Sequence, residues 1–314
     1  MRRFKKILAF VNGPKSIVSL KRAINLAVEN QAELLALDVL RPPSSLFQAF
    51  SGNDFADGLR KDVVRQREEE LQTMVAERVS PGLVVSTKVC VGTPYIEIIR
   101  EVLGEGCDLV VKTAEGHGAV RQRIFGGTAF QLMRQCPCPV WIVKPQHDRP
   151  LKRIMAAVDV EVDADFTAHS VLNYDILKIA TSLSEMEGAE LHVVHAWSVW
   201  GEALLKGRVP AEELHRILEE QEKATVRALG TLLESFDVDP HSPYVQLIKG
   251  APGYVIPELV KQAQIELLVM GTICRSGIPG FIIGNTAEQV LSDVDCSVLT
   301  LKPDGFQSPV KQTD

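Results

Sequence analysis

The segment Met270–Glu288 contains the residue types that most clearly suggest binding chemistry in this sequence. Glycines recur along it, and Gly284 is followed directly by Asn285 and Thr286. We predict that a helix begins at this point and spans 286–291. Glycine lets backbone N–H groups approach an anion closely, and a helix start adds unpaired N–H donors and a partial positive charge. The segment therefore predicts a phosphate-binding loop.

Short apolar runs that alternate with helical patterns provide the scaffold for such a loop. Runs rich in Val, Ile and Leu between helices predict a parallel sheet with both faces covered. Ligands bind beyond the carboxyl ends of the strands in such sheets, and the glycine-rich segment follows a predicted strand. In the first part of the chain the predicted strands are Ile7–Val11, Leu34–Val39, Val84–Val91, Leu109–Lys112 and Val140–Val143.

Internal repetition shows that the chain contains the same domain twice. The pattern of Phe4–Asn12 returns in Leu151–Asp159, at an offset of 147 residues. The Gly92-Thr93-Pro94 element returns as Gly250-Ala251-Pro252, at an offset of 158 residues. A repeat of this length is a duplicated domain and not a solenoid unit. We predict a first domain at residues 1–148, a second at 149–304 and a disordered polar tail at 305–314.

Helical periodicity places long charged helices at corresponding positions of the two copies, about Leu59–Arg78 and Ala211–Phe236. Pro94 and Pro252 are predicted at helix starts, where the missing N–H of proline is harmless. Right-handed crossovers between parallel strands then give each copy a doubly wound sheet of about five strands. The predicted fold class is α/β, with two tandem doubly wound domains.

Composition excludes several classes of protein. The chain of 314 residues has a net charge of −6, 46% hydrophobic and 24% charged residues, which are values of a globular protein. The acidic balance argues against a dedicated nucleic-acid binder. No apolar run reaches 18 residues, so no membrane span is predicted. Six cysteines without a CxxC spacing suggest reduced thiols and a cytoplasmic location.

The duplicated fold, the strand end Val158-Asp159, the Gly250-x-Pro252 element and the glycine-rich segment together resemble the universal stress proteins in tandem form. The resemblance covers nearly the whole chain and implies domains of the adenine-nucleotide alpha-hydrolase type. ATP-binding members of the family carry Gly-x2-Gly-x9-Gly-(Ser/Thr) after the fourth strand. The second copy has Gly271-x2-Cys274-x9-Gly284-Asn285 at this place, with Thr286 next.

The resemblance implies a nucleotide site in the second copy. Asp159 would face the adenine end, and the backbone near Ala196 would pair with the base. Cys274 and Asn285 depart from the family pattern. The first copy departs further, with Asn12 in place of the aspartate and Thr113-x2-Gly116-x9-Gly126-Gly127 in place of the glycine motif. The implied cofactor-binding set is Asp159, Ala196, Gly271, Cys274, Gly284, Asn285 and Thr286.

The function implied is a cytoplasmic stress-response protein that binds ATP, with Mg as an accompanying ion, and acts as a nucleotide-responsive regulator of an unidentified protein partner. No catalytic residues are predicted, and at most slow ATP hydrolysis. The sequence identifies no metal ligands. In the family, single domains dimerise through their last strands, so Val140–Lys144 and Val298–Lys302 are predicted to pair antiparallel as an intrachain pseudo-dimer. The sequence leaves open whether two such chains also associate as a homodimer.

Two alternatives stay open beside nucleotide binding. The chain could be an interaction scaffold whose pockets bind no nucleotide, which the Cys274 and Asn285 departures favour. A pocket could also serve another ligand, because Pro42–Gly58 contains apolar side chains that could cover an acyl chain. Cys136 and Cys138 lie on one side of an extended segment, where they could chelate an ion weakly or pack near Trp141.

Overall fold

A computed structural model describes residues 4–42, 53–115, 125–146, 149–160, 168–199, 201–272 and 284–312. The chain divides into two compact units, each of which is described by itself. Unit 1 comprises Met1–Asp148 together with Gln307–Asp314, and unit 2 comprises Arg149–Phe306. The polar C-terminal residues therefore group with unit 1, although the sequence predicts them as a disordered tail.

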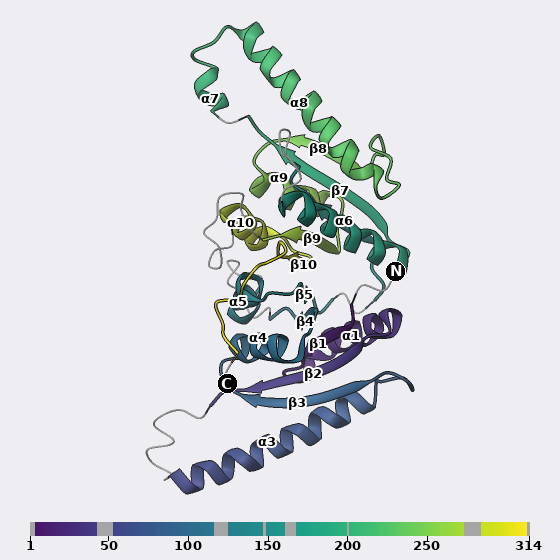
Figure 1. Ribbon diagram of the computed structural model, residues 1–314, viewed down its shortest axis with the longest axis vertical. Coiled ribbons are helices and arrows are strands. Elements are labelled where there is room, and N and C mark those ends of the chain that lie inside the picture. The colour runs from purple at the N-terminus through teal and green to yellow at the C-terminus, as the bar shows by residue number, and fades with distance from the viewer. Residues whose placement is uncertain are drawn as a thin grey trace. The chain divides into compact units, whose positions relative to one another are not determined.

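Unit 1 alternates strands and helices from its start (Figure 1). The elements are β1 (Lys6–Phe10), the 3-10 turn η1 (Pro14–Ser16), α1 (Ile17–Asn30), β2 (Glu33–Leu40), α3 (Asn53–Ala76), β3 (Val85–Val91), α4 (Pro94–Glu105), β4 (Leu109–Thr113), α5 (Gly127–Gln135) and β5 (Val140–Val143). All five predicted strands of this copy are confirmed to within one residue at each end.

Unit 2 repeats the same order of β-strands and long helices, and its described residues also include the short helix α7, whose counterpart positions in unit 1 lie outside the described residues. The elements are β6 (Arg153–Ala157), α6 (Ala168–Glu187), β7 (Glu190–Trp197), α7 (Glu202–Leu205), α8 (Ala211–Glu234), β8 (Val245–Lys249), α9 (Pro252–Gln262), β9 (Leu267–Gly271), α10 (Asn285–Asp293) and β10 (Ser297–Leu301). Pro94 and Pro252 begin α4 and α9, as predicted.

The sheet of each unit is parallel and doubly wound. The strand order is β3-β2-β1-β4-β5 in unit 1 and β8-β7-β6-β9-β10 in unit 2. The central strand β1 pairs with β2 and β4, and β6 pairs in the same way with β7 and β9. Since the strand order reverses at the central strand, the carboxyl ends of these three neighbours form the edge where ligands bind in such folds. We call this edge the rim of each unit.

The apolar runs that predicted the strands form the core of each unit. Ile7, Leu8 and Val110 in unit 1 are completely buried, as are Ile154 and Leu268 in unit 2. Burial on both faces explains why these strands read as continuous apolar runs instead of alternating ones. The helices α1 and α6 pack against the central strands of their own units. The core thus fixes the strands whose carboxyl ends make the rim.

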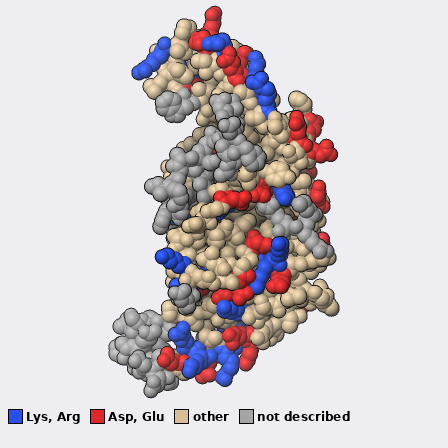
Figure 2. Space-filling view, in the orientation of Figure 1, with Lys and Arg blue, Asp and Glu red and all other residues tan. Residues whose placement is uncertain are grey.

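The long helices α3 and α8 have 24 residues each and start at positions 158 residues apart. Along α8, acidic and basic side chains are mixed on the outer surface (Figure 2). Arg216 lies 2.6 Å from Glu213 and 3.3 Å from Glu220, with one helical turn between partners. The acidic side chains of α8 therefore lie on a solvent-exposed helix face. Among the described residues, no helix is both long and apolar enough to cross a membrane.

His192 on β7 should make unit 2 sensitive to acid. Its ring is buried edge-on against Tyr244, with centroids 5.0 Å apart, and its Nε2 lies 4.0 Å from the Glu190 carboxylate. Burial lowers the pKa of His192, and Arg153 lowers it further, although Glu190 opposes the shift. The unfolded chain therefore binds more protons than the folded one below pH 6.5, the ordinary value.

We expect the stability that comes from neutral His192 to be complete above that pH and to be lost as the pH falls through 6.5 towards the folded pKa. The loss cannot exceed about 1.4 kcal/mol per pH unit for one group. Urea unfolding between pH 7.5 and 5 would measure it, with His192→Phe as the control. Equal pH dependence of the two proteins would contradict the prediction.

Candidate functional site

Asp159 lies at the rim of unit 2, just after β6, and Asn173 of α6 fixes its backbone. The backbone N–H of Asp159 donates to Asn173 Oδ1 at 2.9 Å, and Asn173 Nδ2 donates to the Asp159 carbonyl at 2.8 Å. Asn173 is buried, whereas Asp159 is exposed. A side-chain amide with a donor and an acceptor can satisfy both backbone groups at once. The carboxylate is thus presented from a rigid backbone.

The end of β7 presents backbone groups towards the same rim. Alternate residues of a strand direct their N–H and C=O to opposite sides. Val194 bonds on the β6 side, where its carbonyl accepts from Val158 N–H at 3.0 Å, whereas Trp197 bonds on the β8 side with Gly250. Ala196 therefore turns its N–H and C=O to the β6 side, beyond the point where β6 ends.

His195, next to Ala196, is buried and faces the same end of β6. Its Nδ1 lies 3.0 Å from the carbonyl oxygen of Val158. A carbonyl can only accept, so Nδ1 carries the proton in this contact. His195 thereby ties the end of β7 to the residue just before Asp159.

Gly271 is the last residue of β9, and the packing of α6 leaves no space for a side chain at this position. A Cβ at this position would lie 2.8 Å from Leu172 Cδ2 and 3.7 Å from Ile176 Cδ1. Both side chains belong to α6 and are buried. Close packing of α6 on β9 therefore requires glycine here, whether or not a ligand also approaches.

The start of α10 supplies the helix N-terminus that the sequence predicts. Gly284 is the N-cap residue, with φ −58° and ψ 142°, and its N–H donates to the Thr272 carbonyl at 3.1 Å. Any residue can adopt this backbone conformation. Asn285 and Thr286 are exposed in the first turn. Cys274 lies outside the described residues.

A contact that the sequence analysis missed joins the ends of β9 and β10. Thr272 is completely buried, and its backbone N–H donates to the Leu301 carbonyl at 3.2 Å. Lys302, the residue after β10, donates a hydrogen bond from Nζ to Thr272 Oγ1. A Lys-Pro pair follows the last strand in both copies, at 144 and 302. That repetition was the available signal for a lysine at the rim.

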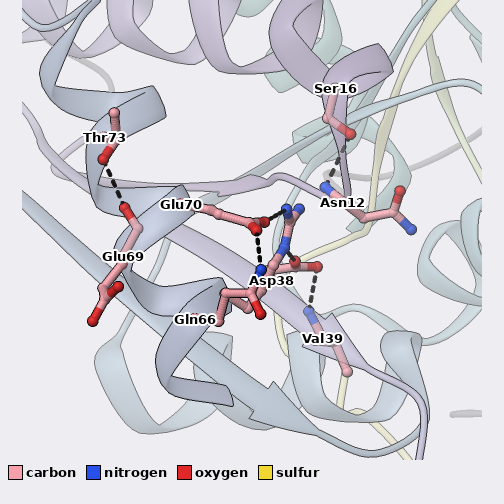
Figure 3. Close-up of polar contacts among 9 residues, drawn as sticks. Asn12, Ser16, Asp38, Val39, Gln66, Glu69, Glu70 and Thr73 are labelled. Carbon is pink, nitrogen blue, oxygen red and sulfur yellow. Dashed lines mark hydrogen bonds and ion pairs between the residues drawn. The ribbon is translucent and has the colours of Figure 1, made fainter. Parts of the chain in front are cut away.

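The rim of unit 1 is built differently, because its own charged side chains occupy it (Figure 3). Asp38 of β2 is buried and accepts a hydrogen bond from the Val39 backbone N–H at 2.7 Å. Arg67 of α3 donates from Nε to the same carboxylate and from Nη1 to Glu70 at 2.8 Å. Asp38 and Arg67 belong to none of the motifs predicted from the sequence.

The electrostatics of this cluster favour the charged forms of Arg67 and Glu70. Burial alone would lower the pKa of Arg67, but hydrogen bonds to Asp38 and Glu70 raise it above its ordinary value. The hydrogen bond from Arg67, with a second from Gln66, lowers the pKa of Glu70. Asp38 therefore faces a permanently charged guanidinium.

Two further features separate unit 1 from unit 2. Asn12 takes the place of Asp159, and its backbone N–H donates to Ser16 Oγ at 3.0 Å, so Ser16 accepts the hydrogen bond that Asn173 accepts in unit 2 (Figure 3). Lys112 at the end of β4 is 1% exposed, and its Nζ lies 2.7 Å from Glu115 Oε1. Burial lowers the pKa of Lys112, against the opposing effect of Glu115.

The topology thus brings Asp159, Ala196 and Gly271 onto three adjacent strands of one rim, at the end of β6, β7 and β9. Of the first copy's motif, Gly116 lies outside the described residues. The predicted apolar cover at Pro42–Gly58 lies largely outside them too, except that α3 already begins at Asn53.

Residues 3–144 and 150–302 each match the Universal stress protein family. The chain therefore belongs to this family and carries its domain twice. The α/β fold class predicted from the sequence is confirmed.

Relatives with the same tandem length identify the branch that the chain resembles. Universal stress protein E of Escherichia coli K12 is 31% identical over 268 residues, which cover 83% of this chain and 82% of that protein. The Universal stress protein E homolog of Haemophilus influenzae is 26% identical over 313 residues, covering 96% and 98%. The crystal structure of the functionally unknown protein PA1789 from Pseudomonas aeruginosa PAO1 has a TM-score of 0.70 at 25% identity, covering 97% and 95%.

Proposed function

We propose that the protein is a cytoplasmic stress-response regulator that binds ATP, accompanied by Mg, at the rim of unit 2. Membership of the universal stress protein family supports the stress-response role. The nucleotide site rests on the likeness of Asp159, Ala196, Gly271, Cys274, Gly284, Asn285 and Thr286 to the family's ATP-binding motif. Binding would be sensed by an unidentified protein partner, with at most slow hydrolysis.

The observation that carries the proposal is the different use of one backbone position in the two units. In unit 1 the N–H of Val39 donates to Asp38, which Arg67 holds in place. In unit 2 the corresponding residue is Ala196, whose N–H and C=O face the side where β6 has ended. A base seated there would meet a donor and an acceptor, the pattern that complements an adenine edge. Unit 2 is therefore the better host for a nucleotide.

A matched pair of substitutions tests the site. Asn285 of unit 2 and Gly127 of unit 1 are the first residues of α10 and α5. We expect titration calorimetry with ATP and Mg to give one site per chain, and Asn285→Asp to weaken it at least tenfold by repelling the phosphates. Gly127→Asp should bind ATP normally, because the proposed site lies in unit 2. The variant should also fold, since nothing lies within 4 Å of a Cβ at Gly127. An acidic residue in a first helical turn is stabilising, so lost binding would not reflect unfolding.

Absence of heat with the unsubstituted protein would overturn the proposal. Loss of binding in Gly127→Asp but not in Asn285→Asp would move the site to unit 1. Phosphate release measured over hours would separate a sensor from an ATPase, because a sensor keeps its nucleotide intact.

The packing of Leu172 against Gly271 favours a second candidate, an interaction scaffold that binds no nucleotide. In that case Gly271 is needed only for the packing of α6 on β9, and the Cys274 and Asn285 departures mark a nucleotide-binding motif that has been lost.

We further propose that Val140–Lys144 and Val298–Lys302 pair antiparallel as an intrachain pseudo-dimer. Its support is that β5 and β10 each end the strand order of their own unit and that the family domain occurs twice.

A further inference from the structure

The turn between α5 and β5 of unit 1 holds two thiols in contact. Cys136 Sγ and Cys138 Sγ lie 3.5 Å apart. Cys136 is completely buried, and Cys138 is partly exposed. The pair lies at the opposite edge of the sheet from the rim, so the proposed nucleotide site does not use it. Two thiols at this distance need only a small movement to form a covalent bond.

Two prolines hold this turn in shape. Each cysteine precedes a proline, Pro137 or Pro139, and a residue before proline is confined to extended conformations. Cys136 has φ −70° and ψ 131°, and its N–H donates to the Leu132 carbonyl at 2.9 Å. The Pro139 carbonyl accepts from Val110 N–H at 3.0 Å. The segment is therefore anchored at both ends, with both side chains on one side.

The corresponding turn of unit 2 shows that folding does not need the second thiol. Val294 takes the place of Cys136, with nearly the same backbone conformation, φ −79° and ψ 137°. Its N–H donates to the Val290 carbonyl at 3.0 Å, and its side chain is buried. Cys296 corresponds to Cys138. An aliphatic side chain thus satisfies the packing at this place, and the thiol pair is a feature of unit 1.

We propose that Cys136 and Cys138 form a redox-active dithiol that hydroperoxides, such as hydrogen peroxide, convert into an intrachain disulfide. The partly exposed Cys138 reacts first. Its thiolate attacks a peroxide oxygen, an S–O bond forms, the O–O bond breaks, and the leaving hydroxide takes up a proton to become water. Cys136 then loses its proton and attacks the sulfenic sulfur of Cys138. The S–S bond forms as the S–O bond of the sulfenic acid breaks, and the leaving hydroxide takes up the proton from Cys136 to become the second water, so one hydrogen peroxide is reduced as two thiols are oxidised.

The surroundings of the pair set the rate of this reaction. The hydrogen bond with Cys136, together with burial, raises the pKa of Cys138 above the ordinary value of 9.0. Burial also raises the pKa of Cys107 to about 12 and that of Cys90 to about 11. Only a small thiolate fraction is present at neutral pH, so oxidation is slow and should speed up about tenfold per pH unit through pH 9. Proximity of a second thiol, and not acidity, distinguishes the pair.

Peptide mapping provides the test, because the tryptic peptide that begins at Gln135 contains Cys136 and Cys138 and no other cysteine. The full chain is treated with millimolar hydrogen peroxide at pH 8.5, free thiols are blocked with N-ethylmaleimide, and peptides are analysed by mass spectrometry. We expect this peptide to lose both free thiols as an internal disulfide, which dithiothreitol restores. The reduced protein should also bind phenylarsine oxide, a dithiol probe, in a 1:1 ratio at this peptide.

Cys136→Val provides the matched control, since unit 2 folds with Val294 at this place. The variant should melt within a few degrees of the unsubstituted protein, lose arsenical binding at this peptide and accumulate sulfenic or sulfinic acid on Cys138. An internal disulfide that fails to form, a disulfide of Cys138 with another cysteine, or identical oxidation products in the variant would each overturn the proposal.

Discussion

Replacement of Arg67 by methionine is expected to lower the free energy of unfolding of unit 1 by about 3 to 5 kcal/mol. The substitution leaves the Asp38 carboxylate, whose side chain is only 4% exposed, without its charged partner. Removal of one partner from a buried ion pair is strongly destabilising, because the remaining charge has lost both water and counter-charge. Methionine keeps most of the volume, so lost packing contributes little. Urea unfolding monitored by tryptophan fluorescence would measure the change, in a Trp197→Phe/Trp200→Phe background so that Trp141 of unit 1 gives the signal.

The double variant Asp38→Asn/Arg67→Met is the control for this result. It removes both charges and should recover most of the lost stability, since an uncharged pair carries no comparable desolvation cost. Unit 2 shows that the fold does not need an arginine here, because the position 158 residues after Arg67 is the buried Thr225. A loss below about 1 kcal/mol in the single variant would show that the pair contributes no more than a surface salt bridge.

Gly271→Ala is expected to destabilise unit 2 by about 1 to 3 kcal/mol, the usual cost of overpacking. The new Cβ would lie 2.8 Å from Leu172 Cδ2, so α6 has to move away from β9. The control is Gly230→Ala in α8, where nothing lies within 4 Å of a Cβ. Alanine should stabilise that helical position by about 0.5 to 1 kcal/mol. Equal effects of the two substitutions would contradict the packing explanation.

A double-mutant cycle with Leu172→Ala separates packing from ligand binding at Gly271. Leu172→Ala makes room for the new methyl group, so the double variant should be at least about 1 kcal/mol more stable than the sum of the single effects predicts. Titration of the same double variant with ATP gives the second readout. If Gly271 serves only α6, affinity returns with stability. If a ligand also approaches Gly271 closely, stability recovers without affinity.

The strands and helices of both units could be predicted because their signals are local. Continuous apolar runs gave every strand of unit 1 to within one residue, and proline marked the starts of α4 and α9. The helix α8 was predicted to within two residues at each end, whereas α3 begins at Asn53, six residues before the predicted start at Leu59. The glycine-rich segment predicted the start of α10 to within one residue.

The contacts that fix the site needed the tertiary structure. Asn173 lies 14 residues from Asp159, and nothing in the spacing says that its amide meets both backbone groups. Gly271 suggested a ligand, but its neighbour is a leucine from α6. Lys302 and Thr272 are 30 residues apart and meet only because β9 and β10 end side by side.

By itself the sequence determined the parallel α/β architecture and its duplication. These follow from hydrophobic periodicity and from the repeat, which any folded form of the chain must satisfy. Only the tertiary structure decided that Arg67 and Asp38 occupy the rim of unit 1 and that Asn173 holds the backbone of Asp159 at the rim of unit 2. That choice depends on which side chains the packing of α3 and α6 brings to each rim, and a sequence pattern carries no record of distances between elements.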